Sequence, residues 1–299
     1  MRRRERDDDR LPGETAFVAG FIGLLVATLG SMGCSWILIM VLAARRGIAI
    51  GGSATGASEA LGRLQIELPV ITTSLLVTAL GLVVPGLLAA RVARVPAREA
   101  LGFRPAKPAL FVAAVVGIAA LGPASDLLVR LYDARFPGHS MDNLALLVGI
   151  ARREPWWIAV PLLALVPGFG EEVFFRGLVL RSIRRPWLAI PISALGFAAI
   201  HLDPPHVVGV IPLGFYLAYV AYRADSTWVT IVAHAANNTI AVIAAKTGLP
   251  GSAADEPPPP LGWVIGGVFV ALLVCVYVER ATRRGSLAST SERASATSA

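Results

Sequence analysis

Two adjacent glutamates stand inside an otherwise apolar stretch of this chain. Glu171 and Glu172 follow the sequence Pro-Gly-Phe-Gly, and Arg176 comes four residues after Glu172. On a helix this spacing puts Glu172 and Arg176 on one face, in the order that favours an ion pair. Glu171 is rotated about 100° away and does not share that partner. A carboxyl group in this position can act as a general base or as a ligand.

Two histidines lie in apolar stretches further along the chain. His201 ends the sequence Phe197-Ala-Ala-Ile-His201, and His234 begins the sequence His234-Ala-Ala-Asn-Asn238. His234 and Asn238 are four residues apart, so they project from one helix face. Each buried polar group needs a partner, and one shared site would supply it. The candidate catalytic residues are therefore Glu171, His201, His234 and Asn238, with Glu172 and Arg176 in support.

The other histidines and the cysteines carry weaker signals. His139 lies in a polar Pro-Gly-His-Ser loop and is expected at the surface. His206 follows an Asp-Pro-Pro turn and is either a helix-end residue or a partner of the candidate site. Cys34 and Cys275 both lie in apolar runs and form no CxxC motif, so we expect packing residues and no disulfide framework.

The composition shows what kind of element must position these residues. The chain has 299 residues, of which 55% are apolar and 16% are charged, against roughly 25% charged residues in a soluble domain. A spanning helix needs about 20 mostly apolar residues, and this excludes an ordinary soluble enzyme in favour of an all-α, polytopic transmembrane bundle of about eight spans. The apolar stretches are 16–44, 68–90, 109–131, 156–180, 187–202, 206–222, 227–245 and 261–278. The fifth and sixth are short and meet at residues 203–205, so they are two tilted spans or one broken element.

The basic residues give a topology. With eight spans and a cytoplasmic N-terminus, 18 of the 27 Lys and Arg residues fall on inner segments and 8 on outer ones, as the positive-inside rule requires. Both termini are then cytoplasmic. The net charge of +7 is thus explained by topology, and we expect the lipid bilayer and no nucleic acid as a partner. The scarcity of lysine suggests a bacterial cytoplasmic membrane.

The chain divides into five expected segments. These are a charged cytoplasmic arm (1–15), N-terminal transmembrane helices and loops (16–155), a core that holds the polar motifs (156–247), a proline-rich loop with the last transmembrane helix (248–284), and a disordered tail (285–299).

The depths of the polar residues in the membrane show whether they can meet at one level. At 1.5 Å per residue, Glu171 lies about 13 Å and His234 about 10 Å from the inner ends of their helices. His201 lies about 21 Å from the inner end of its helix. The mismatch predicts that the fifth helix is shortened at its inner end.

Three motifs in this order resemble the CPBP intramembrane protease family, which contains the type II CAAX prenyl proteases and bacterial Abi-like proteins. The motifs are EExxxR at Glu171–Arg176, FxxxH at Phe197–His201 and HxxxN at His234–Asn238. The segment Glu99–Arg104 also resembles a short leader found between early helices of such proteins. The resemblance covers the core at 156–247, and the first three helices lie outside it.

The resemblance implies hydrolysis of a peptide bond within or at the edge of the membrane. By it, Glu171 with His201 would activate the attacking water, and His234 and Asn238 would polarise the scissile carbonyl. Glu172 would hold Arg176. The implied substrate is a membrane-associated protein or peptide. Donors fixed in a low-dielectric pocket stabilise developing charge well, which agrees with these roles.

The residues leave the part of a metal open. Glu171, His201 and His234 are three ligands of the kind that bind catalytic zinc, and the family is commonly labelled metalloprotease. Against a metal, the chain has no HExxH sequence and Asn238 is a poor zinc ligand. Zinc and a metal-free glutamate mechanism are both retained.

Two other functions use the same residues. A transporter or proton-coupled channel would use the buried glutamate and histidines as a relay. A non-catalytic immunity or scaffold protein would keep the fold without the reaction.

Overall fold

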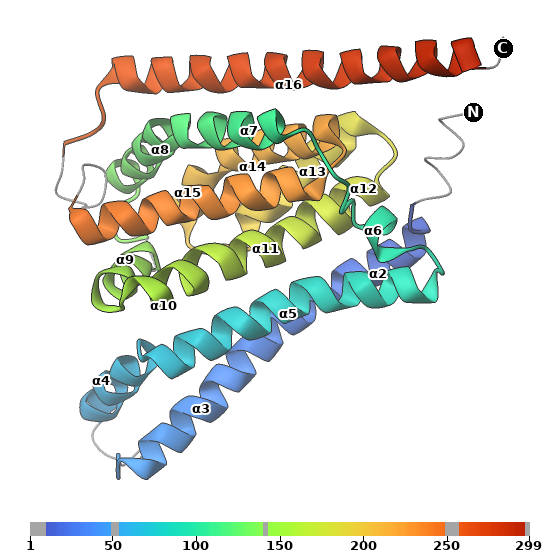
Figure 1. The fold of residues 1–299 in the computed structure, drawn as a ribbon. Coiled ribbons are helices and arrows are strands. Elements are labelled where there is room, and N and C mark those ends of the chain that lie inside the picture. The colour runs from blue at the N-terminus through green and yellow to red at the C-terminus, as the bar shows by residue number, and fades with distance from the viewer. Residues whose placement is uncertain (1–9, 49–53, 140–142, 249–256, 297–299) are drawn as a thin grey trace.

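The described part of the protein is helical throughout. The computed structural model describes residues 10–48, 54–139, 143–248 and 257–296, and every regular element in these ranges is a helix (Figure 1). The all-α prediction is confirmed. The expected segments at 1–15, 16–155, 248–284 and 285–299 lie partly outside the described residues, and the bounds of the five segments stay predictions.

Seven helices of the described chain are long and apolar enough to cross a membrane. They are Gly13–Arg45, Leu68–Val92, Pro108–Arg135, Trp156–Ser182, Pro204–Ala224, Thr227–Thr247 and Leu261–Arg283. The remaining predicted stretch forms a shorter apolar helix, α13 (Pro186–Ala199). Seven long helices and one short helix agree with the expected eight, and the protein is an integral membrane protein.

Several of these helices consist of more than one element. The first comprises α2 (Gly13–Leu25), η1 (Val26–Gly30) and α3 (Ser31–Arg45), followed by α4 (Ala54–Gln65), α5 (Leu68–Val92) and α6 (Ala97–Ala100). Next come α7 (Pro108–Ala120), α8 (Gly122–Arg135) and α9 (Asn143–Arg153), and after the core the chain ends in α16 (Leu261–Ala296). The start of α2 and the end of α16 lie at the same end of the bundle, on the right of Figure 1.

The fifth helix differs from its prediction at both ends. It begins at Pro186, so the predicted shortening at its inner end is wrong. It ends instead at Ala199, and His201 lies in the turn before α14 (Pro204–Ala224). Leu202 has left-handed backbone with a φ of 60°, and proline disfavours helical backbone in the residue before it, so α13 and α14 are separate helices joined by a turn. His201 is therefore a turn residue, two positions past the helix.

The helix that carries the paired glutamates is irregular and central. It runs without a break through α10 (Trp156–Val160), η2 (Pro161–Leu165), α11 (Val166–Glu172), η3 (Val173–Val179) and α12 (Leu180–Ser182). The two η segments are π-helical, a form often found at functional sites. In the most apolar stretch of this helix 50% of the residues are buried. The corresponding figures are 17% in the first spanning helix and 11% in the last. The glutamates thus lie in the interior of the bundle.

Two glycines bring neighbouring helices close to this central helix. A Cβ atom on Gly168 would lie 3.0 Å from the backbone nitrogen of Ala235 in α15 (Thr227–Thr247). A Cβ atom on Gly170 would lie 3.1 Å from Cα of Ala79 in α5. Larger residues would push these helices apart. The Gly/Pro cluster before Glu171 therefore also sets how closely α11 packs on α5 and α15.

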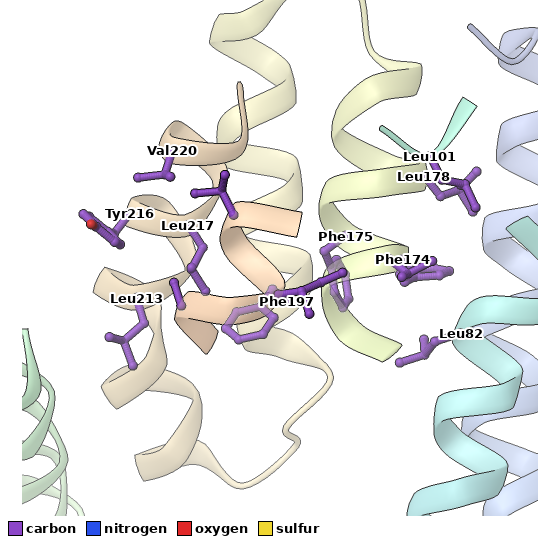
Figure 2. Packing of buried hydrophobic residues seen from close by; sticks show 14 of the residues in the cluster. Leu82, Leu101, Phe174, Phe175, Leu178, Phe197, Leu213, Tyr216, Leu217 and Val220 are labelled. Carbon is purple, nitrogen blue, oxygen red and sulfur yellow. The ribbon is translucent and has the colours of Figure 1, made fainter. Parts of the chain in front are cut away.

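The main hydrophobic core joins the early helices to the central helix (Figure 2). Phe174 and Phe175 are adjacent, and their rings lie 4.9 Å apart between centroids. Phe175 meets Phe197 of α13 edge to face at 5.8 Å, while Phe174 lies near Leu82 of α5 in Figure 2. One connected core thus fixes η3 between the N-terminal helices and α13.

The last helix continues past the predicted span. α16 runs to Ala296, whereas the Ser/Thr/Ala-rich segment 285–299 is expected to be disordered. Alanine, glutamate and arginine in this segment have good helix propensity, which accounts for helical backbone there.

Candidate active site

Glu172 is the centre of a fully buried charged group. Its Oε1 atom accepts a hydrogen bond of 2.8 Å from Nη1 of Arg176 and lies 3.0 Å from Nδ1 of His234. The Glu172 and Arg176 side chains are both completely buried, and His234 is 5% exposed. The pair that the i,i+4 spacing predicts therefore forms, and it extends to a histidine on another helix.

Arg176 is held by two further helices of the core. Its Nη2 atom donates to the carbonyl oxygen of Gly214 in α14 at 3.1 Å. Its guanidinium carbon lies 4.4 Å from the centroid of the Phe197 ring in α13, a cation–π contact that is strongest where water is excluded. Arg176 thus ties η3 to α13 and α14 while it neutralises Glu172. These contacts fix the position of the Glu172 carboxylate.

Glu171 lies beside this group and does not join it. Its Oε2 atom is buried and has no hydrogen-bond partner among the described residues. The same atom lies 4.0 Å from Nε2 of His234, and the Glu171 side chain is 13% exposed. The two glutamates therefore have different surroundings. Glu172 accepts hydrogen bonds from Arg176 and His234 at its Oε1 atom, while its Oε2 atom is buried without a hydrogen-bond partner among the described residues. Glu171 accepts none from these two residues, and its side chain is the more exposed of the two, so it is available to a further molecule.

The contact with Glu172 fixes the protonation of one nitrogen of His234. An ionised carboxylate only accepts hydrogen bonds, so Nδ1 of His234 carries the proton shared with Glu172. Nε2 then points toward Glu171. A carboxylate that accepts from one ring nitrogen of a histidine fixes the orientation of the ring. His234 is thereby positioned between the two glutamates.

His201 lies apart from these groups. Its Nδ1 atom lies 2.9 Å from the carbonyl oxygen of Phe197. The Phe197 ring contacts the rings of both His201 and His234, at 5.2 and 5.5 Å between centroids. On its other side His201 meets His206 edge to face at 4.4 Å. The structure thus makes His206 a neighbour of His201, and it shows Phe197 in contact with both candidate histidines.

Asn238 lies one turn along α15 from His234. Its Nδ2 atom is 3.4 Å from the carbonyl oxygen of Leu163 in η2, and its Oδ1 atom is 3.4 Å from Nδ2 of Asn237. Both contacts are at the long limit for hydrogen bonds. The amide is therefore weakly held and free to turn toward another acceptor.

One contributor to the site was missed in the sequence, and the role of a second was not predicted. The Gly214 carbonyl accepts from Arg176, and the sequence carries no signal for a backbone group 38 residues away. Phe197 was noted as part of a motif, and its position under the Arg176 guanidinium gives a physical reason for an aromatic ring there.

The candidate metal ligands do not converge in this structure. Glu171 and His234 lie 4.0 Å apart, but Nδ1 of His201 contacts a backbone carbonyl. Within the described ranges, no group of three His, Cys, Asp or Glu side chains is arranged to hold a metal ion. Zinc requires nitrogen or oxygen ligands at about 2.0–2.2 Å, so the residues as placed do not fit a three-ligand zinc site.

The segment that resembles the family leader packs beside the site. Arg104 pairs with Glu99 at 2.8 Å and with Asp225 at 2.6 Å, and Asp225 also pairs with Arg181 at 2.7 Å. Burial alone would raise the pKa of the Asp225 carboxyl, but the two guanidinium groups outweigh it and hold that pKa below its usual value. These ion pairs tie the leader to the α14–α15 turn.

An aromatic contact links the same leader to the glutamate helix. Phe103 stacks on Phe169 of α11 with centroids 6.4 Å apart and meets Trp228 of α15 at 5.2 Å. Phe169 is two residues before Glu171. The leader therefore supports α11 and α15 at the point where they hold Glu171 and His234.

Comparison with known proteins agrees with the three motifs. Residues 153–240 match the family model described as Type II CAAX prenyl endopeptidase Rce1-like. A Bacillus subtilis (strain 168) protein described as "Putative membrane peptidase YdiL" is 28% identical over 109 residues, which cover 36% of this chain and 44% of that protein. The chain thus spans less than half of the length of this relative. No solved structure matches.

All the candidate site residues fall inside the matched segment. The predicted resemblance to the CPBP family is therefore confirmed for residues 153–240, and this segment resembles membrane peptidases of the CAAX-protease type.

Proposed function

We propose that this protein is an intramembrane endopeptidase that hydrolyses a peptide bond of a membrane-associated protein or peptide. The observation that carries the proposal is the unequal environment of the two glutamates. Glu172 is completely buried and its Oε1 atom is bound to Arg176 and His234, whereas Glu171 is 13% exposed, is bound to neither residue and has its Oε2 atom 4.0 Å from Nε2 of His234. Glu172 holds His234 in place beside Glu171. Glu171 is then the carboxylate proposed to take part in the reaction.

Glu171 is the proposed general base. A water molecule held at its Oε2 atom would give a proton to the carboxylate while its oxygen attacks the scissile carbonyl carbon. The same proton would then pass to the leaving amine. Burial helps, since few water molecules compete for the carboxylate and its interactions are stronger in a low dielectric.

His234 is the proposed donor to the oxyanion. For this role Nε2 must carry a proton in addition to Nδ1, which donates to Glu172. Nε2 would then donate to the carbonyl oxygen as it becomes negative. Asn238, whose present hydrogen bonds are long, would supply a second donor.

The proposed role of His201 is to assist Glu171 in orienting the water. Its Nδ1 atom is engaged with the Phe197 carbonyl, which leaves Nε2 to act. The Phe197 ring contacts both histidines, so this ring connects His201 to the part of the site that holds His234 and Glu171.

The test compares peptides released in proteoliposomes loaded with membrane proteins. Glu171→Gln keeps the shape of the side chain and removes the base, so we expect the new peptide termini to disappear. Glu59→Gln in α4 is the matched control, because Glu59 is exposed and lies outside residues 156–247, which hold the site. If Glu171→Gln released the same termini as the unchanged protein, the proposed function would be wrong. Ion flux without peptide release would favour a transporter instead.

A further inference from the structure

A cavity outside the candidate active site opens at one end of the bundle. It has a volume of about 270 Å³ and lies where α12, the α14–α15 turn and α16 come together, near the start of α2. This is the right-hand end of the bundle in Figure 1. Its lining includes Arg176, which also holds Glu172, but not Glu171, His201 or His234. The cavity therefore shares one wall residue with the candidate site and none of the proposed catalytic residues, and its volume is close to the lower range of ligand pockets.

The wall of this cavity is strongly basic. Five arginines line it together with a single carboxylate, Asp225: they are Arg10, Arg176, Arg181, Arg223 and Arg283. Asp225 already pairs with Arg181 and with Arg104. Glu279, outside the lining, pairs with Arg223 at 3.1 Å and with Arg283. Even with the carboxylates behind the wall counted, positive charge dominates the cavity.

Three of these arginines carry hydrogen-bond donors that the described chain does not satisfy. The Nε atoms of Arg176, Arg181 and Arg223 are buried and have no hydrogen-bond partner among the described residues. The Arg176 side chain is completely buried. A buried charged donor without an acceptor is costly, and three on one cavity wall call for a ligand that brings several acceptor oxygens.

We infer that this cavity binds a phosphate group. A phosphate presents oxygens in several directions and matches guanidinium groups that approach from η3, α12 and α14. A carboxylate has only two oxygens on one side. The cavity lies at the ends of spanning helices, at the level of phospholipid headgroups, and Tyr222 at its rim is 41% exposed, as is typical of residues at the membrane interface. The phosphate comes from an anionic lipid headgroup or from free inorganic phosphate.

The test measures lipid retained on the purified full-length protein by native mass spectrometry. The probes are dioleoylphosphatidylglycerol, dioleoylglycerol, which lacks the phosphate, and inorganic phosphate added as a competitor. Arg223→Gln removes one wall guanidinium and leaves Glu279 its contacts with Arg283 and Tyr219. Arg98→Gln is the matched control, because Arg98 is 65% exposed in α6 and does not line the cavity.

We expect one tightly held phosphatidylglycerol that Arg223→Gln weakens about tenfold, the loss of one charge-assisted hydrogen bond. Arg223→Lys, which keeps the charge and loses the planar fork, should weaken it less, and Arg98→Gln should change nothing. Displacement by inorganic phosphate, with no preference for the lipid, would support the phosphate site with the free ion as its source.

Equal retention of dioleoylglycerol, or equal weakening by Arg98→Gln and Arg223→Gln, would overturn the inference. The cavity would then be a basic surface without a built site. The readout is binding, so its failure is independent of any result on peptide hydrolysis.

Discussion

The two halves of the candidate site are built in different ways. On α11, η3 and α15, buried charged groups meet across the bundle at 2.8–3.0 Å. At the α13–α14 turn, His201 contacts a carbonyl only four residues back in its own chain and the ring of His206. The first half is fixed by tertiary contacts among several helices. The second depends on where one helix ends, so it can move without disturbing the core.

The largest effect should come from breaking the first half at Arg176. Arg176→Met keeps the apolar length of the side chain and leaves Glu172 as a buried carboxylate without its ion pair. Such a loss costs about 3–5 kcal/mol. We expect a large drop in the midpoint of thermal unfolding in detergent. Arg98→Gln serves as the control, and a midpoint for Arg176→Met equal to that of this control would contradict the buried network.

A smaller effect should separate the two histidines. His234→Ala removes a buried group that is bonded to Glu172, so we expect a loss of about 1–3 kcal/mol. His201→Ala removes a half-buried side chain whose only polar contact among the described residues is local, so its cost should be about 1 kcal/mol or less. The thermal unfolding midpoints of the two variants test the comparison directly. A lower midpoint for His201→Ala than for His234→Ala would show that the turn contributes more to stability than the buried group does.

The close approach of α11 and α15 offers a third test. Gly168→Ala places a Cβ atom 3.0 Å from the Ala235 backbone and should cost about 1–3 kcal/mol through overpacking. Gly149→Ala in α9 is the matched control, because no atom lies within 4 Å of its added Cβ. There the gain in helix propensity should stabilise slightly. Equal shifts in the two unfolding midpoints would rule out tight α11–α15 packing.

The smallest effect concerns the ion pairs that hold the leader. The pKa of Asp225 is lower in the folded protein than in the unfolded chain, so its stabilising contribution is present above the unfolded value of about 3.9 and is lost as the pH falls through the folded pKa. The difference in unfolding midpoint between the unchanged protein and Asp225→Asn should therefore be constant near neutral pH and shrink below about pH 4. The effect is modest because the Asp225 side chain is 41% exposed.

The sequence predicted the first half of the site better than the second. The i,i+4 spacing of Glu172 and Arg176, and the isolation of Glu171, follow from helix geometry alone. The position of His201 does not, because α13 ends before it in a turn and the Phe197 ring lies against it. The large depth of His201 indicated that the fifth helix differs from the predicted stretch. The difference is that the helix ends before His201, and its start is not shortened.

Other features lay beyond sequence reasoning because they join distant segments. The Gly168 and Gly170 contacts depend on which helices become neighbours. The basic cavity brings together arginines from positions 10 to 283. Four of them look in the sequence like ordinary charges at helix ends, and the fifth, Arg176, was predicted only as the partner of Glu172. The sequence pattern predicts which segments span the membrane. These sites form only where particular spans pack against one another.

The division of labour between the two glutamates is tested most directly by measuring cleavage and stability together for two isosteric variants. Glu171→Gln and Glu172→Gln are compared in proteoliposomes on a substrate identified from the released termini. We expect Glu171→Gln to lose at least about a hundredfold in cleavage rate, the usual contribution of a general base, with an unchanged unfolding midpoint. Glu172→Gln should lower both. Full cleavage by the Glu171→Gln protein would contradict the assignment of Glu171 as the base.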